Sequence, residues 1–354
     1  MPRSIIAGSG SWIPPNRVTN DMLSRIMDTS DDWIRERSGI LTRYFVDEGT
    51  ATSDVALAAS RNALEMAGIG AQDLDLIVFA TMTPDYLFPG SGGLLQAKLG
   101  ARDIPCFDIR QQCSGFVYGM QMADAHIRAG LARNVLLVGA EVHIGFMPWT
   151  RANYDFMFGK SDIPPTPEEH AWNTRFRHLT VLFGDGGAAV VIRAREEAGR
   201  GIVDSVLHAD GSDYQRLFVP GTGFRHRPYV DHDQLRRGDH IPVMDGRHIF
   251  KYATARMAGV AREILERNGV SPDSLSLVLM HQANLRINDY VRQALGIPAE
   301  KAPTNIERYG NTTAATIPLL WDECARDGRI RPGDLVLMVA FGAGLTWGAV
   351  LLRA

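Results

Sequence analysis

Two stretches of the chain, "LEMAGIGAQDLDLIVFA" at residues 64–80 and "LERNGVSPDSLSLVLMH" at residues 265–281, are built in the same way. Each has an apolar-periodic start, a glycine at Gly68 or Gly269, a short polar link and then an almost unbroken apolar run. Glycine commonly closes a helix, and an unbroken apolar run is typical of a strand buried on both faces. Each stretch therefore predicts a helix that leads into a buried strand.

A second pair of similar stretches follows in the same order. "CSGFVYGMQMADAHIRAGLARNVLLVGA" at residues 113–140 matches "TAATIPLLWDECARDGRIRPGDLVLMVA" at residues 313–340, again about 200 residues further along. Each predicts a helix of about five turns, then a turn and a buried strand. Two matches in the same order indicate an internal duplication, with halves at residues 1–180 and 181–354. Helices alternating with apolar strands predict an α/β fold with mixed, mainly parallel sheets.

The segments where the halves meet have a different character. "LTVLFGDGGAAVVIRA" at residues 179–194 predicts a strand, a glycine-rich turn and a second strand that begin the second half. Before it, residues 147–178 are long, aromatic, polar and rich in proline. This composition predicts an inserted loop or lid rather than a strand or a long helix. Loops of this length in a compact domain are usually functional or disordered.

Composition excludes several classes of function. The chain has 354 residues, 45% of them hydrophobic, and a net charge of −3, which argues against non-specific nucleic-acid binding. Its cysteines, Cys106, Cys113 and Cys324, are odd in number and scattered, which suits a reducing compartment better than a disulfide framework. No apolar stretch reaches the ~18 residues of a membrane span, and the first residues lack a signal-peptide core. We therefore expect a cytoplasmic protein without a membrane partner.

Metal and dinucleotide chemistry are also poorly supported. The ten histidines include no HExxH pair, and the chain has no CxxC motif. The glycine-rich stretches "FGDGGAA" and "FGAGLTWG" lack the GxGxxG spacing of a dinucleotide-binding turn. Their glycines more plausibly allow tight turns and close backbone approach.

The most specific chemical candidate is the cysteine in "DIRQQCSGFVYGM" at residues 108–120. Cys113 lies between a strand-like run and a predicted helix, where the helix N-terminus and a nearby imidazolium would lower the thiol pKa. His281 follows a predicted strand, and Asn311 in "YGNTTAATIP" precedes the helix that corresponds to that of Cys113. Ligands collect at such strand and helix ends, so we expect the three residues in one cleft.

Together these residues suit acyl transfer through a covalent thioester. A cysteine thiolate attacks thioesters readily, and backbone N–H groups at its corner would stabilise the oxyanion. His281 and Asn311 would offer hydrogen-bond donors that polarise a second thioester and stabilise the enolate left when a malonyl group loses carbon dioxide. Taken singly, each has an ordinary structural explanation: a core cysteine, a hydrogen-bonded histidine and a helix N-cap. Their matching places in duplicated halves favour the chemical interpretation.

Four motifs resemble one known family: "CSGFVYGM", "HQANLRIND", "YGNTTAATIPLLWDECARDGRIRPGD" and "FGAGLTWGAVLLR". Along nearly the whole chain except the insertion, the sequence is similar to β-ketoacyl-acyl-carrier-protein synthase III, a condensing-enzyme family of the thiolase superfamily. The resemblance implies a duplicated, five-layered αβαβα fold and a homodimer. It implies that Cys113 is the acylated nucleophile and that His281 and Asn311 activate the extender thioester. The oxyanion hole would use the backbone N–H groups of Cys113 and Ala343.

The same resemblance implies roles around the entrance to the site. Substrates would be coenzyme A or phosphopantetheine thioesters, including acyl carrier protein, with no tightly bound cofactor. Residues implied at the coenzyme A and pantetheine end are Trp33, Arg37, Arg177, Gly246 and Asn284. Residues implied in carrier-protein docking are Arg286, Lys251 and Arg256, for which a solvated charged face is the alternative. Phe88 in "DYLFPGSG" matches a residue that reaches into the partner subunit's acyl pocket.

Two departures from the family pattern leave the substrate open. Gln111 and Gln112 precede the cysteine where relatives usually have small residues, and residues 147–178 are longer than in housekeeping members. The main hypothesis is acylation of Cys113 followed by decarboxylative condensation with malonyl-acyl-carrier-protein or malonyl-coenzyme A. The alternative is a specialised relative that uses a 3-oxoacyl thioester, an alcohol or an amine as acceptor, with pyrone- or quinolone-type products. A non-catalytic partner subunit is disfavoured because Cys113, His281 and Asn311 are all present.

Overall fold

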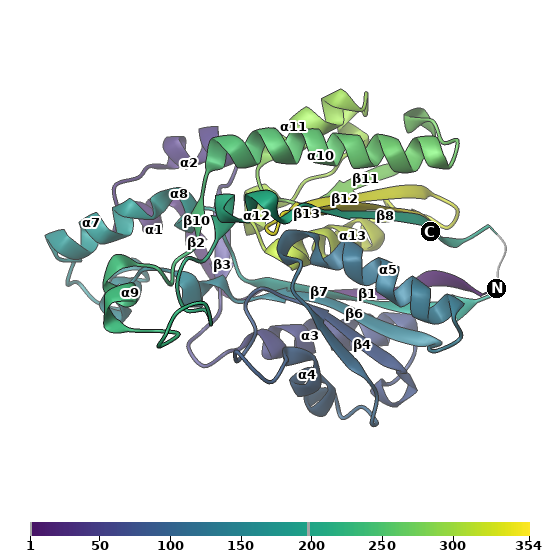
Figure 1. Ribbon diagram of the computed structural model, residues 1–354, viewed down its shortest axis with the longest axis horizontal. Coiled ribbons are helices and arrows are strands. Elements are labelled where there is room, and N and C mark those ends of the chain that lie inside the picture. Colours follow the sequence, from purple (N-terminus) through teal and green to yellow (C-terminus); the bar gives the residue numbers. More distant parts are fainter. Residues whose placement is uncertain (1, 197–198) are drawn as a thin grey trace.

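The computed structural model describes residues 2–196 and 199–354, which form two large sheets with helices between and outside them (Figure 1). The first sheet has the strand order β1-β7-β6-β4-β5 and the second has the order β11-β12-β13-β8. The strands of the first sheet are β1 (Arg3–Trp12), β4 (Leu76–Ala80), β5 (Cys106–Ile109), β6 (Asn134–Glu141) and β7 (Gly186–Arg195). Those of the second are β8 (Gly201–Ala209), β11 (Leu277–Met280), β12 (Leu335–Gly342) and β13 (Thr346–Arg353).

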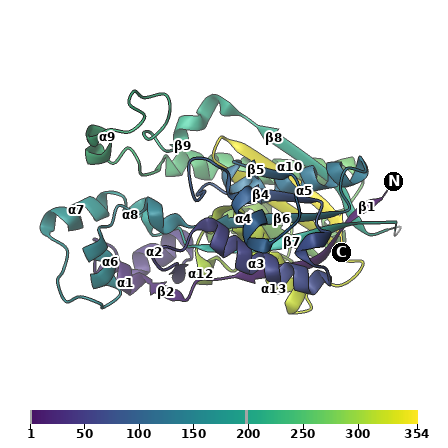
Figure 2. The same cartoon turned by 90° about the horizontal axis from the view of Figure 1, so that it is seen from below.

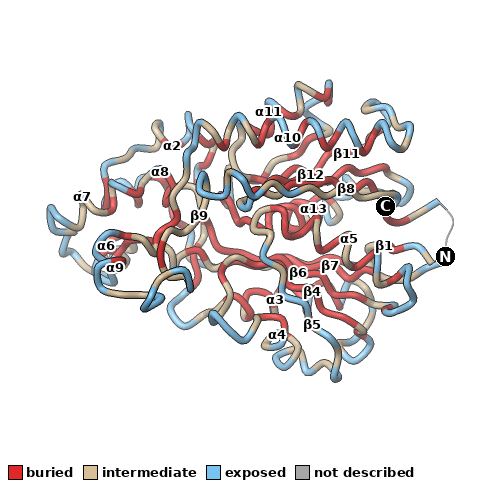
Figure 3. Tube along the Cα trace, viewed as in Figure 1, coloured by how far each residue is buried: buried red, intermediate tan, exposed pale blue. Residues whose placement is uncertain are grey.

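Helices complete five layers, which confirms the expected αβαβα arrangement. Helices α3 (Thr52–Ala67) and α4 (Ser91–Leu99) cover the outer face of the first sheet, and α10 (Gly246–Arg267) and α11 (Leu285–Ala294) cover that of the second (Figure 1). Helices α5 (Gly115–Arg128) and α13 (Thr316–Arg326) lie between the sheets, where their apolar side chains pack against both. Burial is therefore concentrated in the sheets and these central helices (Figure 3).

The predicted helix-to-strand units are present in both halves. Helix α3 ends at Gly68 with φ 65° and leads through the 3-10 turn η1 (Ala71–Asp73) into β4. Helix α10 leads past Gly269, with φ 62°, through η5 (Pro272–Ser274) into β11. Both strands are fully buried, as their unbroken apolar runs indicated.

The second predicted pair is also present but its helices are shorter than five turns. Helix α5 has 14 residues and α13 has 11. Each follows a 3-10 turn, η2 (Gln112–Ser114) or η7 (Thr313–Ala315), whose first residue has a positive φ. The values are 45° for Gln112 and 50° for Thr313, so the two halves bend the backbone in the same unusual way just before the central helices.

The sheets are more evenly mixed than expected. Among the described residues, β4 pairs in parallel with β5 and β6, and β11 pairs in parallel with β12. The remaining pairings in the two sheets, β1 with β7, β6 with β7, β12 with β13 and β13 with β8, are antiparallel. Helices lie between the strands of every parallel pair in the chain, whereas among the described antiparallel pairs only β12 and β13 follow each other directly through a short turn.

The segment at residues 179–194 differs from its prediction. It contains the end of α8 (Arg177–Thr180) and most of a single strand, β7, rather than a strand, a turn and a strand. Strand β7 pairs with β1 and β6 and so lies in the first sheet, and β8 is the first strand of the second sheet. An apolar run shows that a strand is buried but not which sheet receives it. We propose that the two halves meet after β7 rather than at residue 180.

The inserted segment is folded rather than a loose loop. It contains the short helices α6 (Arg151–Met157) and α7 (Pro167–Arg175) and the start of α8. Trp149 and Met157 pack with α1 (Asn20–Ser24) and α2 (Asp31–Ser38) in a small separate core. Helix α9 (His232–Arg237) ends at Gly238, which lies against Trp172 and Phe176 of the insertion. These short helices gather at the end of the molecule opposite the chain termini (Figures 1 and 2).

Several short elements complete the chain. They are the strand pair β2 (Asn16–Thr19) with β3 (Thr42–Phe45), the pair β9 (Leu217–Phe218) with β10 (Val243–Met244), helix α12 (Ile306–Tyr309), and the 3-10 turns η3 (His143–Phe146), η4 (Gly211–Arg216) and η6 (Ala299–Lys301). No helix in the described part of the chain has both the length and the apolar character needed to cross a bilayer.

Candidate active site

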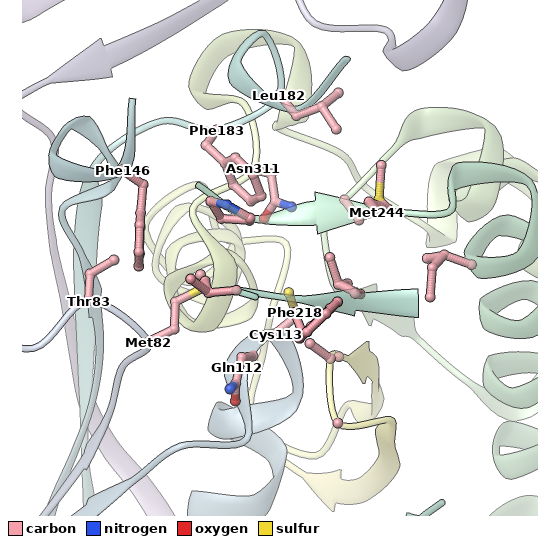
Figure 4. Close-up of a pocket in the computed structure, with 18 of the residues that line it drawn as sticks. Met82, Thr83, Gln112, Cys113, Phe146, Leu182, Phe183, Phe218, Met244 and Asn311 are labelled. Carbon is pink, nitrogen blue, oxygen red and sulfur yellow. The ribbon is translucent and has the colours of Figure 1, made fainter. Parts of the chain in front are cut away.

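Cys113, His281 and Asn311 line the same cavity, which has a volume of about 1600 Å³. The three residues come from the ends of different elements: η2 before α5, the residue after β11, and the loop before η7. Figure 4 shows Cys113 and Asn311 on the two sides of this space, with Phe218 and Met244 on its wall. The duplicated topology therefore brings together residues that are up to 198 positions apart in the chain.

The turn that carries Cys113 is held closely by the C-terminal hairpin. A Cβ on Gly342, the last residue of β12, would lie 3.0 Å from the Cys113 backbone nitrogen and 2.9 Å from that of Ser114. Glycine is thus required here for the close approach of the two backbones. The next residue, Ala343, also lines the cavity and is not among the described residues with positive φ. An alanine at this position is therefore free of the backbone strain that a positive φ would cause.

The expected lowering of the Cys113 pKa is wrong. Burial and, to a smaller extent, the buried Glu141 raise the pKa of the Cys113 thiol to about 12, although hydrogen bonds from the Cys113 backbone and the Thr313 side chain act in the opposite direction. A charged thiolate loses more by leaving water than it gains from the N–H groups of one helix start. The sulfur of Cys113 is therefore a neutral thiol at neutral pH.

His281 is also neutral, and the position of its proton can be assigned. Burial lowers the pKa of His281 to about 3. Its Nδ1 lies 2.7 Å from the Thr316 hydroxyl, which donates its only proton to the Thr313 carbonyl at 3.0 Å. Nδ1 must therefore carry the hydrogen, and Nε2, which has no hydrogen-bond partner among the described residues, carries a lone pair. In the resting protein Nε2 of His281 is therefore a proton acceptor, and its expected role as a donor to the extender thioester stays a prediction.

Asn311 presents the complementary group. Its Oδ1 accepts a hydrogen bond from the Thr313 backbone N–H at 2.8 Å, which fixes the orientation of the amide. The amide nitrogen of Asn311 points into the cavity (Figure 4). The pair thus offers one acceptor, on His281, and one donor, on Asn311.

Buried polar residues that support this arrangement were not found in the sequence. Glu141, at the end of β6, accepts hydrogen bonds from the Thr83 hydroxyl at 2.6 Å, the Thr81 hydroxyl at 3.0 Å and the Met82 backbone. Burial raises the pKa of Glu141 to about 7. The sequence contained one signal for Glu141, which is the carboxylate at the end of the unbroken apolar run "VLLVGAE". An acidic group in a buried strand needs several hydrogen-bond donors around it. Among the described residues, no cluster of histidine, cysteine, aspartate and glutamate could hold a metal ion.

Comparisons with known proteins match this fold and site. Two family models, for 3-oxoacyl-[acyl-carrier-protein] synthase III and for its C-terminal part, match residues 107–161 with 170–211 and residues 265–354. The β-ketoacyl-[acyl-carrier-protein] synthase III of Rhodospirillum rubrum is 43% identical over 358 residues and covers 100% of both chains. The 3-oxoacyl-[acyl-carrier-protein] synthase III structure from Aquifex aeolicus is 39% identical, with a TM-score of 0.84 over 99% of this chain and 100% of that chain.

The chain belongs to the 3-oxoacyl-[acyl-carrier-protein] synthase III family. A second similar structure is the priming β-ketosynthase of the R1128 polyketide pathway, 30% identical with a TM-score of 0.85 over 99% of this chain and 96% of that chain. The gap between the matched parts of the synthase III model, residues 162–169, falls inside the inserted segment. The synthase III model thus leaves eight residues of the inserted segment unmatched, while it matches the segment that holds Cys113.

The positions that the synthase III resemblance assigns to coenzyme A lie near the cavity mouth. The guanidinium groups of Arg37 and Arg177 lie 4.4 Å and 4.8 Å from the ring centroid of Trp33. Trp33 and Arg37 line the cavity, whereas Arg177 reaches Trp33 from outside it. Gly246 opens α10 and Asn284 caps α11, where its amide donates to the Arg37 carbonyl at 2.8 Å; both line the cavity.

The proposed docking cations are not all in one place. Arg286 lines the cavity and lies 5.6 Å from the Phe250 ring centroid. Lys251 is exposed on α10 and does not line the cavity. Arg256, further along α10, lies over Tyr252 and Trp347 at 4.7 Å and 4.8 Å. Of these three cations, only Arg286 lines the cavity.

Phe88 lies on a separate exposed apolar surface. It is 80% exposed, beside Tyr86 at 62% and Leu87 at 50%. Leu87 also lines the cavity. The surface formed by Tyr86, Leu87 and Phe88 thus connects the exterior to the space in front of Cys113.

Proposed function

We propose that this protein is a condensing enzyme that joins an acyl group to a malonyl-derived unit and releases carbon dioxide. The acyl group comes from an acyl-coenzyme A thioester, and the product is a 3-oxoacyl thioester of acyl carrier protein. The observation that carries this proposal is the meeting of a buried thiol, an unpartnered His281 Nε2 and the Asn311 amide in one cavity of a synthase III fold.

In the first half-reaction, the sulfur of Cys113 attacks the carbonyl carbon of the acyl thioester. Its proton moves to Nε2 of His281, and the backbone N–H groups of Cys113 and Ala343 stabilise the oxyanion. Coenzyme A leaves as a thiol, because His281 gives this proton to the departing sulfur and returns to its neutral form. A neutral thiol with a neutral base in the same cavity suits this step, because the charge forms only when the substrate is in place.

In the second half-reaction, the malonyl thioester loses carbon dioxide and becomes an enolate. The Asn311 amide donates a hydrogen bond to the enolate oxygen, and His281 donates a second from Nε2–H in the neutral tautomer reached when the Thr316 hydroxyl turns to donate to Nδ1. The enolate carbon then attacks the acyl group on Cys113, the carbon–sulfur bond breaks, and the sulfur leaves as a thiolate that takes a proton from water. Because burial lowers the pKa of His281 to about 3, a neutral ring rather than an imidazolium serves this step.

The surroundings of the cavity suit acidic thioester carriers. Arg37, Arg247 and Arg286 line the cavity together with Arg110, whereas Asp85 is its only carboxylate among the described residues. Arginine groups recognise phosphates through paired hydrogen bonds. We therefore assign the Trp33, Arg37 and Arg177 cluster, with Gly246 and Asn284, to coenzyme A or phosphopantetheine, and Arg286, with Lys251 and Arg256 as outlying cations, to carrier protein.

The quaternary state and location belong to the same proposal. A surface as apolar and exposed as that of Tyr86, Leu87 and Phe88 is typical of an interface. We assign it to a homodimer in which Phe88 reaches the partner subunit's acyl pocket, and we place the enzyme in the cytoplasm. The comparisons favour the malonyl acceptor over the alternative of a 3-oxoacyl thioester, an alcohol or an amine.

The test is carboxyl-labelled malonyl-acyl-carrier-protein supplied with a series of acyl-coenzyme A donors. We expect labelled carbon dioxide and a 3-oxoacyl product in equal amounts, both dependent on the acyl donor. Acyl transfer without carbon dioxide release would instead support the alternative acceptors. Neither acyl transfer nor carbon dioxide release with any donor would contradict the proposal.

A further inference from the structure

A second buried histidine lies beside the site but has no place in the reaction proposed above. His143 follows β6 in η3, is 1% exposed, and stacks on Phe183 at 4.8 Å between ring centroids. Burial lowers the pKa of His143 to about 4, so its ring is neutral and carries a single hydrogen. Both ring nitrogens have partners, and these partners determine where that hydrogen is.

The hydrogen of His143 lies on Nδ1. This nitrogen is 2.8 Å from the Gly184 carbonyl oxygen, which can only accept. Nε2 is therefore a bare acceptor, and it lies 2.6 Å from the Thr313 hydroxyl. Thr313 must donate its hydroxyl proton to His143. The short separation indicates a strong hydrogen bond.

The same Thr313 hydroxyl acts on the nucleophile. A hydrogen bond from the Thr313 side chain lowers the pKa of Cys113, because a donor stabilises the thiolate. A hydroxyl has one proton and cannot donate to both the sulfur and Nε2 of His143. The backbone of Thr313 is fixed, with φ 50° and its N–H bound to Asn311, so only the hydroxyl rotation can change.

We propose that His143 is a positioning residue that holds the Thr313 proton away from the sulfur of Cys113 and so adds to the burial that keeps this sulfur a thiol. When the thiolate forms, the Thr313 hydroxyl turns to the sulfur and leaves Nε2 of His143 buried without a partner. Loss of the hydrogen bond between Thr313 and His143 therefore opposes ionisation of the Cys113 thiol by about the free energy of one hydrogen bond. This holds until a substrate provides new contacts.

Other charged or titratable groups around these atoms are Glu141, which faces Cys113 from β6, Asp185, which accepts the His143 backbone N–H at 2.6 Å, and His281 across the cavity. None of them accepts the Thr313 hydroxyl proton. The competition between His143 and Cys113 for that proton can therefore be tested separately from the effects of these charged neighbours. The inference rests on the proposed role of Cys113, but it concerns the free thiol and not acyl transfer.

The test is the rate at which iodoacetamide alkylates Cys113 without any acyl donor, measured by mass spectrometry of the Cys113 peptide at one pH between 7 and 9. Because alkylation follows the thiolate fraction, we expect His143→Leu to react roughly 3- to 10-fold faster than wild type. Thr313→Val removes the hydroxyl for which His143 and Cys113 compete, and Thr313→Ser keeps a hydroxyl at this position as a control. In the Thr313→Val background, His143→Leu should have no further effect.

A merely structural role of His143 gives a different pattern. If replacing it only loosened the site, alkylation would accelerate equally in the wild-type background and in the Thr313→Val background, and that result would overturn the inference. An unchanged rate in His143→Leu would also overturn it. In case that variant does not fold, nitrogen-15 NMR of wild-type histidines gives a second test. The expected signal for His143 is a neutral ring with hydrogen on Nδ1 between about pH 6 and 8, and a ring protonated on Nε2 would contradict it.

Discussion

At Cys113, two physical effects that act on one sulfur have opposite signs. Backbone N–H groups at a helix start favour the thiolate, and this was the reason to single out the residue in the sequence. Burial in the cavity wall and the nearby Glu141 favour the thiol, and they prevail. A cysteine at a helix N-terminus therefore supports nucleophilic catalysis through its position, while the depth at which it lies decides its charge.

The Glu141 contribution predicts a pH-dependent effect of Glu141→Gln. Burial raises the pKa of Glu141 to about 7, so its negative charge is present above that pH and absent below it. We expect Cys113 in the variant to alkylate several-fold faster than wild type at pH 8.5 and at nearly the wild-type rate at pH 5.5. A rate ratio that stays constant across this range would show that the charge of Glu141 does not act on the thiol.

Asn311 permits a separation of the two half-reactions. Asn311→Asp keeps the oxygen that accepts from the Thr313 backbone but replaces the amide donor with a charge that repels an enolate. We expect acylation of Cys113 to survive and decarboxylative condensation to fall by about 10²–10³-fold, as for loss of an oxyanion-hole donor. Rapid quench measurement of acyl-enzyme and of carbon dioxide from the same samples distinguishes the steps. Equal losses in both would contradict the assigned role.

At the scale of elements, local signals predicted the duplicated units but not the insertion. Gly68 and Gly269 mark helix ends in both halves, and the strands that follow are buried as their composition indicated. The helices of the insertion are short, and their aromatic and polar residues show no clear apolar period. One signal was present: Thr166, Pro167 and Glu169 in "TPEE" form a capping box with proline in the first turn of α7.

The surroundings of two glycines, Gly10 in β1 and Gly259 in α10, predict opposite effects of alanine substitution on the stability of the protein. A Cβ on Gly10 would lie 2.3 Å from the Ala63 backbone nitrogen, so Gly10→Ala must push the strand and helix apart. We expect it to destabilise the protein by about 1–3 kcal/mol. Gly259→Ala, in the exposed middle of α10 where a Cβ meets nothing within 4 Å, should stabilise it by about 0.5–1 kcal/mol. Thermal denaturation of both variants is the measurement; an unchanged melting temperature for Gly10→Ala would contradict the packing.

At the scale of the whole molecule, the duplication was the most informative feature of the sequence. It predicted the repeated helix-to-strand units and the meeting of Cys113 with His281 and Asn311, because equivalent elements of two related halves end at the same level. It did not predict that β7 returns to the first sheet, since strand partners depend on contacts distant in the chain. The protonation states were also out of reach, because they depend on burial and on second partners such as Thr316.

The exposed surface of Tyr86, Leu87 and Phe88 predicts the oligomeric state. We expect sedimentation to give twice the chain mass of 39.0 kDa for wild type, and a shift toward the monomer for Phe88→Asp because a charge in an apolar interface is costly. Leu131→Asp is the matched control, since Leu131 is 73% exposed in the turn after α5 and should not alter the mass. A monomeric wild-type protein would contradict the dimer assignment.

The central claim is that the sulfur of Cys113 carries the acyl group between the two substrates. The most direct measurement is the mass of the Cys113 peptide after incubation with an acyl-coenzyme A donor and then after addition of malonyl-acyl-carrier-protein. The account predicts an added acyl mass on this peptide that disappears when the second substrate is added, and no added mass in Cys113→Ala, which should not turn over. Turnover at the wild-type rate by Cys113→Ala, or an adduct that the malonyl substrate fails to discharge, would contradict it.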